Sequence, residues 1–164
     1  MPNKKIGYTN NFDLFLLKPN IGIGPFILGK PISACCDGTF QLKINDQINI
    51  LEKDVTDALT KHYSDIIPTR AYYVKKYTKK LVIFVNQYDK IISFSTEILY
   101  FNNKKLIGEN IHKNKKILNV LKWDNIETIN IDEAPQKIYY YDKFGLMFWT
   151  LNDIVLNADI YAVD

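Results

Sequence analysis

Three apolar runs in the middle of the chain recur, in the same order and with similar spacing, at its end. Polar stretches rich in Lys, Asn and Asp separate the runs, as expected for reversals between antiparallel strands. The first set covers residues 71–77, 81–86 and 91–94, and the second covers residues 138–144, 146–152 and 154–157. This internal similarity predicts two related units, each containing a three-stranded antiparallel meander.

A second shared element lies upstream of each predicted meander. Ile27–Ile32 and Leu106–Ile111 both read apolar, apolar, Gly, two Pro or polar residues, Ile. Helical spacing of apolar residues follows in each half, at Val55–Tyr63 after a capping Asp54, and at Lys113–Trp123. In the second helix Ile117, Leu118 and Leu121 are expected on one apolar face.

These patterns predict an α+β protein of two pseudo-repeats, each with a helix packed on an antiparallel meander. The two meanders could join into one concave sheet. The expected divisions are an N-terminal segment (1–18), repeat 1 (19–101) and repeat 2 (102–164). Repeat 1 contains an inserted hairpin at Thr39–Leu51, where apolar residues alternate around Asn45 and Asp46.

Length and composition favour one ordinary globular unit. The chain has 164 residues, 47% of them hydrophobic and 24% charged, with a formal net charge of +3. The N-terminus carries lysines without a following apolar run, so we expect no signal peptide and a cytoplasmic location. No window is long and apolar enough to predict a membrane span. The adjacent pair Cys35 and Cys36 lacks the spacing of a disulfide framework, so its role stays open.

A search for catalytic, cofactor-binding and metal-binding patterns finds none that is convincing. His62 and His112 lie near the two expected helices, but no motif orients either of them toward Cys35. The glycines of Gly22–Pro25 lack a following Gly-Lys-Ser/Thr, so they are interpreted as turn residues. The acidic residues Glu127, Asp132 and Glu133 precede Pro135 and are interpreted as a solvated loop. We therefore predict a protein that is not an enzyme and has no cofactor or metal.

Aligning the two central strands superposes Val82 and Phe84 on Met147 and Trp149. This alignment predicts that part of one sheet face stays open and carries large aromatic side chains, which are efficient protein contacts. The expected partner-binding residues are Tyr73, Phe84, Tyr140, Met147 and Trp149. The alternative is that these side chains fill the core.

Lysine pairs interleaved with tyrosines are the feature that a nucleic-acid-binding protein would show. The pairs fall at Lys4-Lys5, Lys75-Lys76, Lys79-Lys80, Lys104-Lys105 and Lys115-Lys116. Most of them lie at expected turns and helix surfaces, where solvated lysine is usual, and acidic residues are spread through the chain. Nucleic-acid binding is therefore disfavoured but stays open.

The segment Ile21–Ile32 resembles the G-I-G-P-F-x-L-G-x-x-I opening of small bacterial immunity proteins that neutralise contact-delivered toxins. The ending Gly145–Trp149 resembles the close of the same proteins, and the tandem plan is similar in outline to the β-lactamase inhibitor protein fold. The resemblance implies a non-catalytic inhibitor of a cognate toxin or effector protein. We expect the aromatic surface to occlude the active site of that partner, with nearby lysines contacting an acidic partner. A nucleic-acid or other ligand-binding module and a structural globular protein are the alternatives.

Overall fold

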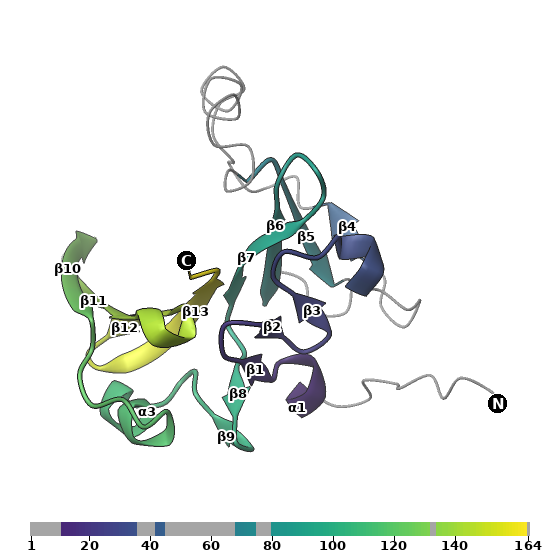
Figure 1. The fold of residues 1–164 in the computed structure, drawn as a ribbon. Helices are drawn as coiled ribbons and strands as arrows, with labels where there is room; N and C mark the ends of the chain where they lie inside the picture. The colour runs from purple at the N-terminus through teal and green to yellow at the C-terminus, as the bar shows by residue number, and fades with distance from the viewer. Residues whose placement is uncertain (1–10, 36–41, 45–67, 75–79, 132–133, 164) are drawn as a thin grey trace.

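The computed structural model describes residues 11–35, 42–44, 68–74, 80–131 and 134–163 (Figure 1). Most elements in these ranges are β-strands, and the named strands pair antiparallel. The main sheet contains β4 (Leu42–Ile44), β5 (Arg70–Val74), β6 (Leu81–Val85), β7 (Ile91–Thr96), β10 (Asn125–Ile131), β11 (Ala134–Tyr141), β12 (Leu146–Leu151) and β13 (Ile154–Tyr161). The predicted antiparallel sheet is confirmed.

The main sheet has eight strands in the order β10-β11-β12-β13-β7-β6-β5-β4. Neighbours in the sheet are consecutive in the chain except at the centre, where β13 lies beside β7. The register there pairs Ala158 with Thr96 and Tyr161 with Ser93. The meanders β5–β7 and β11–β13 therefore join edge to edge, and Figure 1 shows the two arms of the sheet on either side of this junction.

Each meander contains one β-bulge, and the two bulges occupy aligned positions. The β6–β7 register shifts between Phe84 and Val85, and the β12–β13 register shifts between Trp149 and Thr150. A bulge adds one residue to one strand, bends that strand and increases its twist. Both arms are therefore twisted at the same distance from the start of their central strand.

The two glycine segments make equivalent main-chain hydrogen bonds. The N–H of Gly29 donates to the carbonyl of Ile91 (2.7 Å), and the N–H of Ile91 donates to the carbonyl of Lys30 (2.9 Å). The N–H of Gly108 donates to the carbonyl of Val155 (2.8 Å), and the N–H of Val155 donates to the carbonyl of Glu109 (3.0 Å). Both glycines have a left-handed backbone, with φ of 80° and 82°, which a residue without Cβ adopts freely. Each segment is thus fixed to the beginning of the third strand of its meander.

The inner face of the main sheet carries the hydrophobic core. An N-terminal layer packs on it, made of α1 (Asn11–Leu14) and the three-stranded sheet β1 (Leu17–Lys18), β2 (Gly22–Ile23) and β3 (Phe26–Ile27). Phe15, Ile23 and Phe26 of this layer belong to one buried cluster with Phe94 and Phe148 of the main sheet. Burial of each such side chain stabilises the fold by roughly 1.5–3 kcal/mol.

Short elements complete the inner layer. They are η1 (Ile32–Cys35), β8 (Tyr100–Phe101), β9 (Lys104–Lys105), α3 (Ile111–Ile117) and η3 (Asp142–Phe144). Ile111 of α3 is fully buried, and the buried side chain of Asn114 donates to the carbonyl of Leu106 (2.7 Å). These contacts hold α3 against the inner side of the sheet.

The helix predicted at Lys113–Trp123 begins and ends earlier. Asn110 caps α3 by accepting a hydrogen bond from the N–H two residues later (2.9 Å). Asn119 has a positive φ of 55°, which a helix cannot contain. Leu121, expected on the apolar face, is 91% exposed, and Trp123 enters the core instead.

The predicted α+β fold, with a helix on each meander, is wrong. In the part of the chain that the structure describes, strands predominate, and the inner face is covered by the β1–β3 layer together with α3 and the segment that follows it. The helix expected at Val55–Tyr63 lies outside the described residues. Of the hairpin expected at Thr39–Leu51, the described part is β4, which pairs with β5.

The stretch interpreted as a loop around Glu127 is also different, because it forms edge strand β10. Its register with β11 runs from Asn125 opposite Tyr140 to Ile131 opposite Ala134. Most of its described side chains are exposed, among them Ile126 at 50%. A strand that buries little shows no alternation of apolar and polar residues, so its sequence resembled a loop.

Candidate binding face

The sheet register places the five predicted partner-binding residues on one face, here called the outer face, opposite the N-terminal layer. One row of directly opposed residues runs across all eight strands of the main sheet. Its members in β11–β13 and β5–β7 are Tyr140, Met147, Asp159, Ser95, Val82 and Tyr73. Directly opposed residues in antiparallel strands project to the same side. This row therefore aligns Tyr140, Met147 and Tyr73.

The other two predicted residues join the same face by the two-residue period of a strand. Trp149 lies two positions after Met147, opposite Asn157, and Phe84 lies two positions after Val82. All five predicted side chains are partly exposed rather than fully buried. The structure thus brings them onto one continuous sheet surface, although they come from four different strands.

A carboxylate lies at the centre of this face. The indole Nε1 of Trp149 donates to Oδ2 of Asp159 (3.1 Å), and the side chain of Ser95 on β7 also hydrogen-bonds to Asp159. Partial burial raises the pKa of Asp159 above its ordinary value, and the hydrogen bonds from Ser95 and Trp149 oppose that rise. Asp159 therefore joins the two meanders across the β13–β7 junction.

Tyrosine–carboxylate pairs lie on the β10–β13 arm. The hydroxyl of Tyr140 donates to Glu127 (3.1 Å), and the hydroxyl of Tyr161 donates to Asp142 (2.8 Å). Burial raises the pKa of both tyrosines, and the neighbouring carboxylates raise it further. Each tyrosine is consequently held as a neutral donor whose aromatic ring remains on the outer face.

The raised pKa of Asp159 predicts a pH-dependent stability. An acid whose pKa is higher in the folded chain stabilises the fold most below its ordinary value of 3.8, and this contribution is lost as pH rises through the folded pKa. Asp159→Asn is therefore expected to raise the free energy of unfolding at pH 7 and to change it little at pH 3. Urea denaturation at both pH values measures the difference.

The matched control for this prediction is Glu97→Gln, which removes one carboxylate from an exposed turn. We expect the control to show no comparable gain at pH 7. A lower stability of Asp159→Asn than of wild type at pH 7 would show that the two hydrogen bonds outweigh burial of the charge.

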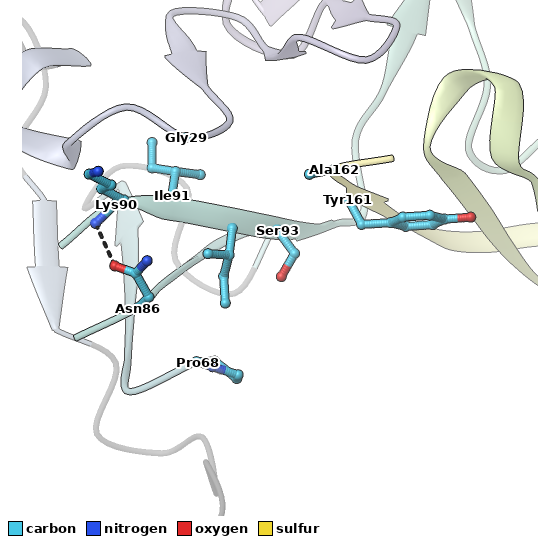
Figure 2. Close-up of a pocket in the computed structure, with 9 residues that line it drawn as sticks. Gly29, Pro68, Asn86, Lys90, Ile91, Ser93, Tyr161 and Ala162 are labelled. Carbon is cyan, nitrogen blue, oxygen red and sulfur yellow. Dashed lines mark hydrogen bonds between the residues drawn. The ribbon is translucent and has the colours of Figure 1, made fainter. Parts of the chain in front are cut away.

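A pocket of about 550 Å³ lies beside the end of the sheet junction, and its lining residues are Gly29, Pro68, Asn86, Lys90, Ile91, Ile92, Ser93, Tyr161 and Ala162. Figure 2 shows Ser93 and Pro68 on one side of β7 and Gly29 with Ile91 on the other. Asn86 accepts a hydrogen bond from the N–H of Lys90 (3.1 Å) and so stabilises the turn that shapes this pocket. No His, Cys, Asp or Glu is among these lining residues.

The other residues considered for chemistry are not brought together in the described parts of the chain. His112 is exposed, and its Nε2 lies 3.8 Å from Oδ2 of Asp153. The thiol of Cys35 donates to the carbonyl of Pro31 (3.6 Å). His62 and Cys36 lie outside the described residues. Among residues the structure describes, no three His, Cys, Asp or Glu side chains are grouped as metal ligands, and no helix there is long and apolar enough to cross a membrane.

Sequence reasoning missed the polar half of the outer face. Asp159 was recognisable as the polar position of an alternating strand, but its partner Ser95 belongs to a strand that only the sheet order makes a neighbour.

Searches of known protein families, curated proteins and solved structures find no match to this chain.

Proposed function

We propose that this chain is a non-catalytic protein-binding inhibitor, an immunity protein that neutralises a cognate bacterial toxin by covering its active site with the outer face. The observation that supports the proposal is the common face of Tyr73, Phe84, Tyr140, Met147 and Trp149. Aromatic and methionine side chains on a rigid surface contribute large contact area with little loss of side-chain entropy.

The rigidity of the surface also supports protein binding. The five side chains project from paired strands, and Trp149 and Tyr140 are each fixed by a hydrogen bond to a carboxylate. A preorganised surface loses little conformational freedom on association, which favours affinity. Side chains fixed in this way are suited to act as anchors for a partner.

Nucleic-acid binding is less favoured by the arrangement of charge. Six lysines and one glutamate lie between residues 102 and 123, around β9 and α3, which belong to the inner side. The partly exposed aromatic residues of the predicted set lie on the outer face. A platform for single strands needs both kinds of side chain on one surface, so these six lysines and this aromatic set do not combine into one.

Trp149→Ala and Tyr140→Ala are each expected to abolish capture of the partner while leaving the fold intact. Central aromatic anchors typically contribute about 2 kcal/mol or more to binding, which corresponds to a loss of affinity of about 30-fold or more. The measurement uses the tagged chain as bait in lysate of the source organism, with mass spectrometry of the proteins that remain after a moderate salt wash.

Leu121→Ala is the matched control, because Leu121 is also apolar and exposed but lies beyond α3 on the inner side. A toxin-like protein retained by wild type and Leu121→Ala, and lost from both aromatic variants, supports the proposal. Purified partner should then lose its toxicity in the presence of the wild-type chain but not of either aromatic variant. Equal retention on all four baits contradicts a role for the outer face.

A further inference from the structure

In β5–β7 and β10–β13, whose side chains the structure describes, the charge of the outer face is one-sided. The charged residues that the register places on it in β5–β7 and β10–β13, within the residues whose side chains are described, are Glu127 and Asp159. No lysine or arginine of those described strands shares this face: Lys137 is opposite Thr150, and Arg70 is opposite Val85, both on the inner side. These strands therefore present no cation to the acidic partner that the sequence predicted.

Further carboxylates extend this charge beyond the end of β11. Asp142 accepts the hydroxyl of Tyr161 (2.8 Å), and the N–H of Asp142 donates to Asp124 (2.7 Å). Both aspartates are exposed. Together with Glu127 they form an acidic rim around the aromatic residues of the β10–β13 arm.

The neighbours of Asp159 leave its charge uncompensated. Both of its hydrogen-bond donors, the indole of Trp149 and the hydroxyl of Ser95, are neutral. A carboxylate has about four acceptor positions, so further donors can be accommodated beside these two. A cationic side chain that reaches Asp159 would also lie against the aromatic ring of Trp149, where a cation–π contact is favourable.

We propose that the partner of the outer face is a protein that presents a patch of arginine or lysine side chains to Asp159 and to the acidic rim of Glu127, Asp142 and Asp124. This inference rests on the proposed function and specifies the chemistry of the partner. The aromatic side chains supply contact area, and the carboxylates select a basic surface and orient it.

The opposite charge on the inner side strengthens this selection. Lys104, Lys105 and Lys116 are exposed in the layer around β9 and α3, where they repel a cationic partner. Complementary charge on one surface and like charge on another steer the encounter and act mainly on the association rate. A basic partner therefore approaches the outer face preferentially.

The test uses the full chain with a photo-crosslinking benzoylphenylalanine in place of Tyr73, which marks the outer face away from the acidic rim. The same probe in place of Leu121 is the position control. After irradiation in lysate of the source organism, the crosslinked segment of the captured protein is sequenced. The captured protein is then purified, and its affinity for Glu127→Gln, Asp159→Asn and the charge-matched control Glu109→Gln is measured at two salt concentrations.

The expected result is a captured segment rich in arginine or lysine, and binding that weakens on the order of tenfold in Glu127→Gln and Asp159→Asn. Binding by wild type should fall with added salt more steeply than binding by either variant, and Glu109→Gln should match wild type. The contrary result is a protein that is captured at position 73 and not at position 121, yet binds with an affinity that changes neither with these substitutions nor with salt. That result overturns the basic-partner inference alone. Capture of no protein, or the same capture at position 121, overturns the proposed function and this inference together.

Discussion

Phe148→Ala is expected to lower the free energy of unfolding by about 3–5 kcal/mol, the usual range for removing a fully buried phenylalanine. Phe148 is 0% exposed and lies on the inner face between Tyr139 and Ala158 in the neighbouring strands. Its ring also contacts Trp123 edge to face, with centroids 6.2 Å apart. The truncation leaves a cavity in the core beside Trp123 and Tyr139, and chemical denaturation measures the loss.

Met147→Ala is the matched control for this prediction, because Met147 precedes Phe148 in the same strand and faces the other side of the sheet. Its side chain is partly exposed, so we expect a loss of roughly 1 kcal/mol. Similar losses for the two variants would contradict the assignment of inner and outer faces on which the candidate binding face depends.

Gly24→Ala is the second substitution with a large expected effect, a loss of roughly 3 kcal/mol or more in the free energy of unfolding. Gly24 has a φ of +51°, and a Cβ at this position would lie 2.1 Å from the carbonyl oxygen of Leu14. The main chain of the turn between β2 and β3 would have to move away from α1 to relieve that contact. Thermal or urea unfolding of the variant tests the prediction.

Gly29→Ala separates the two reasons for this loss. Gly29 also has a positive φ, of 80°, but a Cβ added there would meet no atom within 4 Å beyond its chain neighbours. Alanine there is expected to cost about 1–2 kcal/mol from the left-handed backbone alone. An equal effect at both positions would mean that the close approach of Gly24 to Leu14 contributes nothing to stability.

The strands and faces of the meanders could be predicted because their signal is local. Runs such as Leu81–Val85 and Leu146–Leu151 are apolar, are bounded by turn residues, and resemble one another. Once Val82 and Phe84 are aligned with Met147 and Trp149, the two-residue period assigns all four side chains to one face. The set of candidate binding residues therefore followed from sequence without knowledge of the strand order.

The layer that covers the inner face could not be predicted in this way. Strands β1, β2 and β3 have two residues each, too few to show a period, and they are fixed by contacts with distant strands. Helical spacing after residue 113 was real, but Asn119 adopts a left-handed backbone that ends the helix. Expecting helices where strands complete the core produced the wrong fold class.

The acidic character of the outer face was hidden for a related reason. Asp159 and Glu127 are far apart in sequence, and each looks like an ordinary polar residue of a strand or loop. Their common surface depends on the pairing of β10 with β11 and of β13 with β7. A net charge of +3 for the whole chain conceals a face on which the described side chains of β5–β7 and β10–β13 place only negative charge.

The position of β13 at the centre of the sheet also determines when this protein can fold during its synthesis. A ribosome produces β5, β6 and β7 long before β13. The edge of β7 that pairs with β13 therefore stays unpaired until residues 154–161 emerge. Contacts between such distant segments slow folding and leave a strand edge open to wrong pairing in the meantime. The nascent chain is therefore most vulnerable to aggregation in the interval between the emergence of β7 and that of β13.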